Sequence, residues 1–426
     1  MYTLFISPTL AAGALEGREA ARCSRWLCGA AMWIGVGAIA LPVAAQGDPS
    51  AADPGEAGPS ALKISVGGSS NYDTNLFRRP DSANPLADTI STAYVKLLID
   101  KSYSQQKFKL DLTSTAHRYD KSTHLNFDSL DYQGIWFWSL TPRVSGTVNT
   151  KTSESLAPFD ETLGTKRSVR ITDKRAFSLD GWIFGGWHLL LGASKTDQKS
   201  EEPVVNGPPD FRATSSDFGV QYVATSKNSL TLNRRVTTGD YLDQGPVTAN
   251  SNSNDYREVE TELKVNWMPT GKSSLNGRVA WIQRTNDTVP KSGYSGRVGD
   301  IALNWKPSVK LQFNASATKS LAPFRTATGL SFIESNSFSV DPTWVISAFT
   351  SASVRLSRTY SDFPETGAPG TPARKDIKDH MELSLTWAPT RSISVGASLQ
   401  RQRRASNVPL AAYVSDVAKV NATLTF

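Results

Sequence analysis

Residues 257–267 read REVETELKVNW, with polar and apolar side chains alternating along the whole segment. One face carries Val259, Thr261, Leu263, Val265 and Trp267. Successive side chains of an extended chain point to opposite sides, so the stretch predicts a β-strand with one apolar and one polar surface. Residues 310–318 (KLQFNASAT) repeat the pattern, which dominates from residue 62 onward. In a bilayer such an apolar face contacts lipid directly.

A tryptophan followed two residues later by proline marks the ends of several predicted strands. The motif reads NWMPT, NWKPS and TWAPT, beginning at residues 266, 304 and 386. Trp267, Trp305, Trp344 and Trp387 are separated by 38, 39 and 43 residues. This period equals two strands of about ten residues, one short turn and one longer loop. Proline cannot continue a central strand, so it favours the short turns.

Longer polar segments lie between these repeats, at 72–88, 198–213, 238–255, 321–334 and 361–375. Short turns at one end of a sheet and long loops at the other are typical of outer-membrane barrels. An indole ring is stable at a membrane boundary, so the tryptophans that close descending strands predict a periplasmic aromatic girdle. Its predicted members are Trp138, Trp267, Trp305, Trp344 and Trp387.

We therefore predict an all-β fold, a transmembrane antiparallel up-and-down β-barrel of about 18 strands over residues 61–426, surrounded by outer-membrane lipid. An even number of strands places both termini on the periplasmic side. A soluble propeller also repeats near forty residues. Its four-stranded blades would need strands about half as long as those predicted here.

The N-terminus predicts export from the cytoplasm. Residues 1–25 contain three arginines, residues 26–40 (WLCGAAMWIGVGAIA) are apolar, and Val43 and Ala45 fit signal peptidase. We expect residues 1–45 to be a signal peptide cleaved after Ala45; the alternative is an uncleaved anchor. Residues 46–60 are rich in Pro, Gly and Ala, which predicts a flexible periplasmic lead-in.

Composition excludes several other classes. The net charge of +7 is scattered rather than gathered into a basic block, so no nucleic-acid partner is predicted. Both cysteines, Cys23 and Cys28, lie in the predicted signal peptide, which leaves no disulfide or thiolate metal site. The four histidines are far apart in sequence. We predict no cofactor, no metal site and no catalytic site.

A closed pore follows from the chemistry of the bilayer, because backbone groups cannot stay unpaired in hydrocarbon. A barrel of about 18 strands has a backbone diameter of roughly 35 Å, too wide for side chains to fill. Both signs of charge alternate inward, so no strong ion selectivity is predicted. The candidate lumen-lining residues are Lys109, Asp111, Asp131, Arg143, Glu258, Glu260, Glu262, Lys264, Arg278, Asp300, Asp341, Arg355, Glu382 and Lys419.

The chain ends on an alternating segment, 413–426 (YVSDVAKVNATLTF). Val420, Leu424 and Phe426 share its apolar face. A terminal aromatic on such a strand resembles the signal by which the barrel assembly machinery recognises its clients. We therefore expect that machinery as a partner and Phe426 as the assembly signal.

The stretch 71–78 (NYDTNLFR) follows the first predicted strand. Asp73, Asn75, Leu76, Phe77 and Arg78 resemble a signature of the outer-membrane barrels encoded in exopolysaccharide operons, the EpsL-like putative β-barrel porin group. Segments 117–120 and 124–128 resemble that family's second loop. The resemblance implies an export channel for exopolysaccharide, with the polymer and periplasmic export components as partners. Alternatively, Asp73 and Asn75 bond the local backbone and Phe77 dips into the girdle.

Two other functions compete with this expectation. A diffusion porin for small solutes usually folds a constriction loop inward, and the segment 154–170 is the candidate for such a loop. An outer-membrane enzyme such as a phospholipase needs a Ser–His pair oriented by a carboxylate. His117, His188 and His380 have no evident partner of this kind in the sequence. We therefore expect no enzyme activity.

Overall fold

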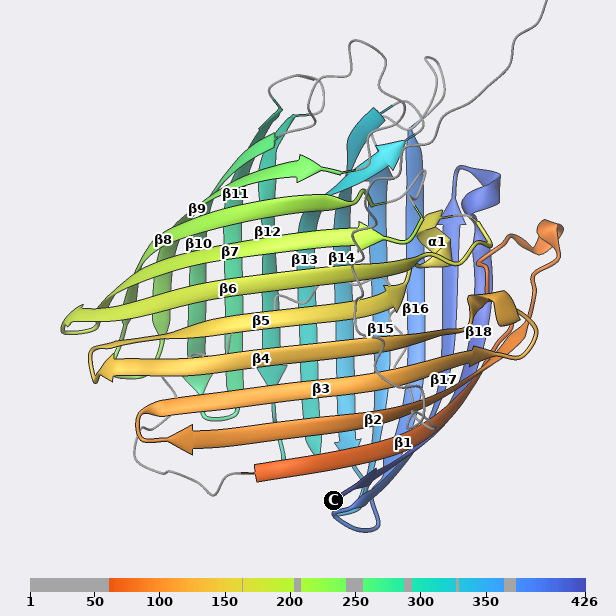
Figure 1. The fold of residues 1–426 in the computed structure, drawn as a ribbon, viewed down its shortest axis with the longest axis horizontal. Helices are drawn as coiled ribbons and strands as arrows, with labels where there is room; N and C mark the ends of the chain where they lie inside the picture. Colours follow the sequence, from red (N-terminus) through yellow and green to blue (C-terminus); the bar gives the residue numbers. More distant parts are fainter. Residues whose placement is uncertain are drawn as a thin grey trace, which may run out of the picture.

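The computed structural model describes residues 61–162, 164–202, 208–242, 256–286, 293–326, 329–363 and 373–426. These residues form one closed antiparallel barrel of 18 strands (Figure 1). The predicted barrel and its strand number are thus confirmed. The predicted signal peptide and lead-in, residues 1–60, lie outside the described residues.

The strands run in chain order around the barrel. They are β1 (Ala61–Asp73), β2 (Asp88–Tyr103), β3 (Gln106–Tyr119), β4 (Phe127–Thr141), β5 (Val144–Leu156), β6 (Val169–Phe184), β7 (Trp187–Ser200), β8 (Phe211–Val223), β9 (Ser229–Tyr241), β10 (Tyr256–Thr270), β11 (Ser273–Asn286), β12 (Tyr294–Trp305), β13 (Leu311–Thr326), β14 (Gly329–Val345), β15 (Thr350–Phe363), β16 (Arg374–Trp387), β17 (Ile393–Ser406) and β18 (Tyr413–Thr425).

The first and last strands close the barrel. β1 pairs with β18 in register from Ser65 opposite Thr425 to Asp73 opposite Val417. Beyond the last strand, the backbone N–H of Phe426 donates to the carbonyl oxygen of Ile64 at 2.8 Å. The terminal residue therefore takes part in closing the sheet, which leaves no free edge along this seam.

One predicted long loop is wrong. Residues 321–334 were expected to form a loop, but β13 continues to Thr326 and β14 begins at Gly329. Phe324 is buried, and its ring lies 5.1 Å from the ring of Phe363 in an edge-to-face contact. This contact lies on the extended part of β13, where the sheet pairing continues through Phe324 opposite Ser331.

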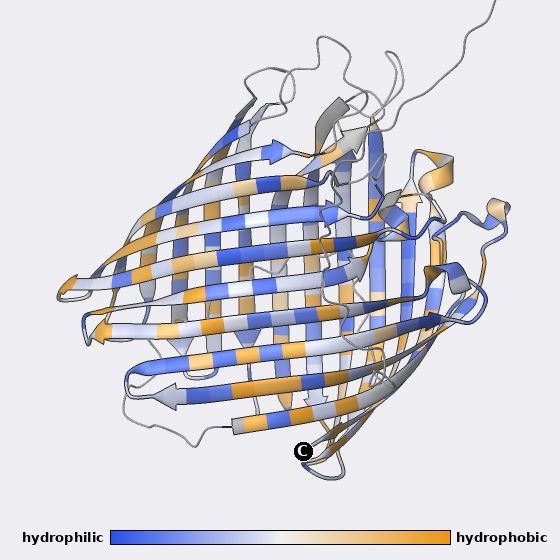
Figure 2. Cartoon of the chain, in the orientation of Figure 1, coloured by the Kyte–Doolittle hydropathy of each residue, from blue (hydrophilic) through white to orange (hydrophobic). Residues whose placement is uncertain are grey.

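Apolar and polar residues alternate along the strands, as Figure 2 shows for the near wall. The large apolar side chains of the outer face are widely exposed, including Leu263, Val265 and Leu383. Such a surface is stable in lipid, and a closed barrel satisfies all backbone groups between its strands. The protein is therefore an outer-membrane β-barrel. Among the described residues, no helix has the length and apolar character to cross a membrane.

The five girdle tryptophans all lie near the ends of even-numbered strands that lead into short turns. Trp267, Trp305, Trp344 and Trp387 are about half exposed. Trp138 differs, because only 8% of it is exposed and its ring stacks 5.9 Å from the ring of Phe177. A Cβ at Gly146 would come within 2.5 Å of the Trp138 ring, so glycine is required beneath the indole.

Candidate functional site at the barrel mouth

The connection between β5 and β6 folds into the barrel. It contains the short helix α1 (Phe159–Thr162), drawn inside the end that carries the longer connections (Figure 1). The ammonium group of Lys378 on β16 donates to the Asp160 carboxylate at 2.7 Å, and the Tyr413 hydroxyl on β18 lies 3.3 Å from it. β16 is seven strands from β5 in the strand order. A connection between neighbouring strands reaches that far only by crossing the lumen.

The wall that receives Asp160 is a row of paired side chains. Lys378 lies opposite Arg404, which lies opposite Tyr413. The Arg404 guanidinium donates to the backbone carbonyl of Asp160 at 2.7 Å and lies 4.7 Å from the centre of the Tyr413 ring. The Tyr413 hydroxyl also donates to Gln402 at 2.9 Å. The β5–β6 connection is therefore anchored by charge, by backbone and by hydroxyl contacts together.

The side chain of Asp160 is stabilised in its ionised form. Burial on its own would raise the pKa of this carboxyl, but the charge and hydrogen bond of Lys378 and the charges of Arg404 and Arg78 lower the pKa to about 2. The carboxylate thus stays ionised over the whole range in which the protein would work.

The signature residues fold the β1–β2 connection onto β18. The Arg78 guanidinium pairs with the Asp73 carboxylate at 2.8 Å, and Arg78 itself has a φ of 55°. Asp73 also accepts the backbone N–H of Asn75 at 2.8 Å and the hydroxyl of Ser415 at 2.7 Å. The Asn75 amide donates to the backbone carbonyl of Val414 at 2.9 Å. Through these contacts Asp73 and Asn75 hold the β1–β2 connection against the start of β18.

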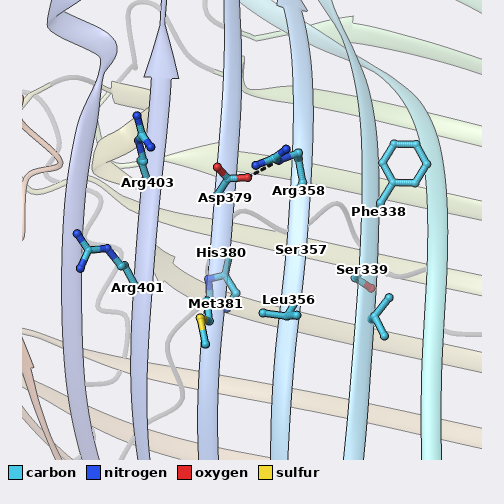
Figure 3. Close-up of a pocket in the computed structure, with 11 residues that line it drawn as sticks. Phe338, Ser339, Leu356, Ser357, Arg358, Asp379, His380, Met381, Arg401 and Arg403 are labelled. Carbon is cyan, nitrogen blue, oxygen red and sulfur yellow. Dashed lines mark hydrogen bonds and ion pairs between the residues drawn. The ribbon is translucent and has the colours of Figure 1, made fainter.

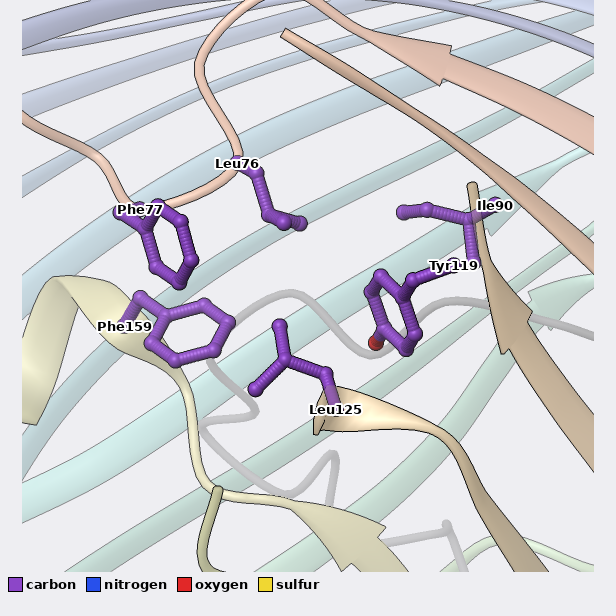
Figure 4. Close-up of a cluster of buried hydrophobic side chains, with 6 residues drawn as sticks. All are labelled: Leu76, Phe77, Ile90, Tyr119, Leu125 and Phe159. Atoms are coloured by element: carbon purple, nitrogen blue, oxygen red, sulfur yellow. The ribbon is translucent and has the colours of Figure 1, made fainter. Parts of the chain in front are cut away.

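An apolar cluster joins the inward connections (Figure 4). This mouth cluster consists of Leu76, Phe77, Ile90, Tyr119, Leu125 and Phe159. The rings of Phe77 and Phe159 meet edge to face at 4.8 Å. The expectation that Phe77 dips into the lipid girdle is therefore wrong, because its ring packs against α1 instead. Its burial helps to hold the β5–β6 connection inward.

The inner face can be followed around the barrel from this anchor, since directly paired residues point to the same side of a sheet. The row that begins at the Asp160 anchor contains Lys378, Thr359, Ser337, Thr318, Asp300 and Arg278. Arg278 therefore faces the same lumen as Lys378. Sequence alternation predicted this face for Asp300 and Arg278.

Charged side chains form a connected ladder on the inner face of β8 to β12. This charged ladder consists of Asp217, Arg235, Glu260, Glu262, Lys264, Arg278 and Asp300. The Arg278 guanidinium pairs with Glu262 at 2.6 Å and with Glu260. Arg235 pairs with Asp217 at 2.5 Å and reaches Glu260 at 3.6 Å. Each charge has an opposite neighbour, so the ladder fixes charges in place without one dominant sign.

Glu262 is the most enclosed member of the charged ladder, with 1% of its surface exposed. Its carboxylate accepts the Asn233 amide at 2.8 Å and pairs with Lys264 at 2.7 Å. A buried carboxylate needs such partners, because losing water without compensation is costly. We therefore regard Glu262 as the centre of the ladder.

Part of the adjoining inner wall, on β13 to β15, is lined by hydroxyl groups. Ser316 and Ser339 lie 2.9 Å apart, and Ser337 and Thr359 also lie 2.9 Å apart. These pairs are uncharged and carry small side chains. The part of the lumen left open by the inward connections is thus bordered by fixed charges on one side and by hydroxyls on the next.

The predicted lumen residues of β3 and β4 lie on the same inner face. Lys109 is 3.9 Å from Asp100, and Asp111 pairs with Lys96 at 2.6 Å. Asp131 accepts a backbone N–H of β5 at 2.9 Å. These charges are separated from the charged ladder by several strands.

Four further predicted residues, Glu258, Asp341, Arg355 and Glu382, form two separate groups. Glu258 pairs with Arg284 at 2.7 Å. Arg355 pairs with Asp341 at 2.5 Å and lies 4.0 Å from Glu382. Both groups therefore contain an arginine and its acidic neighbours.

Two predicted residues have other settings. Arg143 lies in the short turn between β4 and β5 rather than on a strand. Its guanidinium lies 4.5 Å from the centre of the Trp182 ring, and the register connects Trp182 to the inner-face row of Arg278. Lys419 on β18 lies opposite Asn71 and Ser398, on the inner face but away from the ladder.

Several residues of the site were missed from the sequence. Arg235 and Asp217 follow the inward alternation of β9 and β8, so the same rule would have found them. The partners of Asp160 have no local signal, because Lys378 lies 218 positions away in the chain. The segment 154–170 was proposed as a constriction loop, but nothing in the sequence identified its anchor.

One expectation about histidines is also wrong. His188 does have a carboxylate partner, since its Nδ1 lies 2.7 Å from Asp180. His380 lies 3.7 Å from Glu382. Within the described ranges, no group of three His, Cys, Asp or Glu side chains is arranged to hold a metal ion.

Solved structures with a similar architecture come from Pseudomonas aeruginosa. OccK1 (OpdK) shares 12% identity at a TM-score of 0.47, with 86% of this chain and 99% of that chain covered. OpdK with vanillate gives 11% and 0.47 over the same shares, and OccK2 (OpdF) with glucuronate gives 12% and 0.49 over 86% and 98%. At this identity and TM-score the likeness concerns the barrel fold alone. No family model and no curated protein matches the sequence.

The predicted exopolysaccharide export channel is corrected by these findings. The structural neighbours are porins, two of them solved with the small solutes vanillate and glucuronate. Independently, the β5–β6 connection occupies part of the lumen, as was expected of a small-solute porin rather than of an open polymer conduit. The resemblance of residues 71–78 to the exopolysaccharide-operon family stays a prediction.

Proposed function

We propose that the protein is a non-enzymatic diffusion channel for small hydrophilic solutes, with its constriction beside the β5–β6 connection. The observation that carries this proposal is the anchoring of Asp160 across the lumen by Lys378 and Arg404. A segment held in this way narrows a barrel whose backbone diameter would otherwise be roughly 35 Å. Narrowing limits passage to small solutes.

The wall chemistry suits polar solutes without strong selection by charge. The charged ladder pairs acids with bases, which leaves little net field across the lumen. The hydroxyl wall of β13 to β15 can exchange hydrogen bonds with solute hydroxyls or with water. We therefore expect passage of sugars and small organic ions, with weak preference between anions and cations.

The test is channel conductance in planar bilayers, combined with swelling of proteoliposomes in sugars of increasing size. Wild-type protein should conduct ions and admit only small sugars. Asp160→Ala should raise the conductance, by roughly twofold, and admit larger sugars, since the connection loses its anchor. The matched control is Asp120→Ala, because Asp120 is an exposed carboxylate on the neighbouring β3–β4 connection.

A closed barrel that passes neither ions nor sugars would overturn the proposal. So would an unchanged size limit in Asp160→Ala when limited proteolysis shows that the β5–β6 connection has been released. The control variant should retain the wild-type conductance and size limit, which separates loss of the anchor from loss of one loop charge.

A further inference from the structure

The outer face of β15 to β17 carries a cluster of arginines above an apolar floor. Arg358, Arg401 and Arg403 lie beside one shallow hollow whose floor includes Leu356 and Met381 (Figure 3). Asp379 lies opposite both Arg358 and Arg403 in the sheet register. Asp379 is adjacent in sequence to Lys378, whose side chain faces the lumen. Because successive side chains of a strand point to opposite faces, Asp379 and the two arginines opposite it point outward.

The cluster has more positive than negative charge. Arg358 pairs with Asp379 at 2.5 Å, and Arg401 lies 3.6 Å from Asp416. Arg403 forms no ion pair with another described residue. Arg401 remains 65% exposed in its side chain, so most of its donors are free to bind an external partner. The apolar floor beside these donors is also exposed.

The height of the cluster follows from strand geometry. A rise of about 3.3 Å per residue and a tilt of about 40° give roughly 2.5 Å per residue along the membrane normal. Arg358 and Arg401 each lie eight residues from the turn end of their strands, at Thr350 and Ile393. They therefore stand roughly 20 Å above that end, and Arg403 roughly 25 Å. The apolar band of such barrels is about 25 Å tall, so the cluster meets the headgroups of the outer leaflet.

We propose that this cluster binds the phosphorylated headgroup of an outer-leaflet glycolipid. Arginine suits phosphate because its planar guanidinium donates two parallel hydrogen bonds. An unpaired arginine at the edge of the apolar band costs free energy unless an anion accompanies it. The exposed Leu356 and Met381 would contact the acyl chains below that headgroup. This site lies on the lipid face and does not depend on the proposed channel function.

The test uses full-length purified barrel in detergent, titrated with diphosphorylated lipid A and followed by native mass spectrometry. Dephosphorylated lipid A and inorganic phosphate serve as comparison ligands. The double variant Arg401→Gln/Arg403→Gln should bind lipid A about tenfold or more weakly than wild type. Wild type should prefer the phosphorylated lipid by a similar factor.

The matched control is Arg297→Gln. Arg297 also faces outward, eight residues from the girdle residue Trp305, but outside the cluster. It should bind lipid A as wild type does. Heat-modifiable migration like that of the wild type would show that each variant is folded.

Equal affinity of wild type and the double variant would overturn the proposal. Equal binding of the dephosphorylated lipid would also overturn it, because phosphate would then play no part. Displacement of lipid A by millimolar inorganic phosphate, without any contribution from the acyl chains, would indicate a free-anion site and would overturn the lipid assignment.

Discussion

The barrel mouth and the charged ladder both line the lumen, but they are built in different ways. The ladder joins residues on neighbouring strands, where register alone brings Lys264 opposite Arg278. The mouth joins segments far apart in the chain, through Asp160 and its anchor on β16 to β18. The ladder is therefore part of the sheet, whereas the mouth is an attachment to it. Substitutions should separate the two by what they destabilise.

The largest effect is expected at the centre of the ladder. Glu262→Gln removes a buried charge that Arg278 and Lys264 share. Breaking such a buried pair lowers the free energy of unfolding by about 3–5 kcal/mol. Urea unfolding in lipid vesicles measures this change for the whole barrel, and the change should appear in one cooperative transition.

The matched control for that variant is Asp300→Asn, at the edge of the ladder. Asp300 is partly exposed and lies 3.5 Å from Arg278, so its loss should cost under about 1 kcal/mol. Equal losses of unfolding free energy in the two variants would show that burial does not set the strength of the ladder's ion pairs.

A smaller and more local effect is expected in the mouth cluster. Phe77→Ala removes the ring that packs on Phe159. Truncating a buried phenylalanine in this way lowers the free energy that holds the packed state together by about 3 kcal/mol. Because the connections are attached to the sheet rather than part of it, the barrel itself should unfold at the wild-type urea concentration. Limited proteolysis should instead cut residues 157–168 faster.

The control for the mouth is Leu86→Ala, in the same β1–β2 connection. Leu86 is exposed, so its truncation should leave the rate of proteolysis unchanged. If Phe77→Ala instead lowers the stability of the whole barrel, then the mouth and the sheet unfold as one unit.

This difference also explains what the sequence could predict. Alternation identifies the inner residues of a strand without knowledge of its partners, so Glu260, Glu262 and Arg278 were assigned to one face correctly from parity. The number of strands followed from counting the alternating segments along the chain. The register between β10 and β11 then brings residues of the same face into contact, as it does for Glu260 and Arg278.

The mouth could not be predicted in the same way. The anchor of Asp160 depends on the curvature of the closed barrel, which brings β16 to face a connection seven strands away. No local pattern encodes that distance. Likewise, the sequence gives no sign that Trp138 lies flat over Gly146 while the other girdle tryptophans stay open.

Acid should weaken the attachment of the β5–β6 connection at the barrel mouth. The pKa of Asp160 is lowered to about 2, so the docking stabilised by its carboxylate is complete above its ordinary pKa. It is lost as the pH falls from about 4 through about 2, with a total effect of about 2 kcal/mol. Conductance should therefore stay constant from pH 7 to pH 4 and rise below that range. In Asp160→Ala this acid-dependent rise should be absent; its persistence would place the responsible group elsewhere.

The smallest effect is expected from an exposed charge on the lumen face. The Arg355 side chain is 58% exposed, and its pair with Asp341 should contribute under about 1 kcal/mol. Arg355→Gln still removes one positive charge beside Asp341 and Glu382, so the reversal potential in a KCl gradient should shift slightly toward cation preference.

Arg212→Gln provides the matched comparison on the opposite face of the sheet. Arg212 is similarly exposed and pairs with Asp197 at 2.6 Å, but it points away from the lumen. Its loss should leave the reversal potential unchanged, because lipid and barrel wall separate it from the permeating ions. A shift of equal size in both variants would mean that selectivity reports net charge rather than the inner face, and the assignment of that face would then fail.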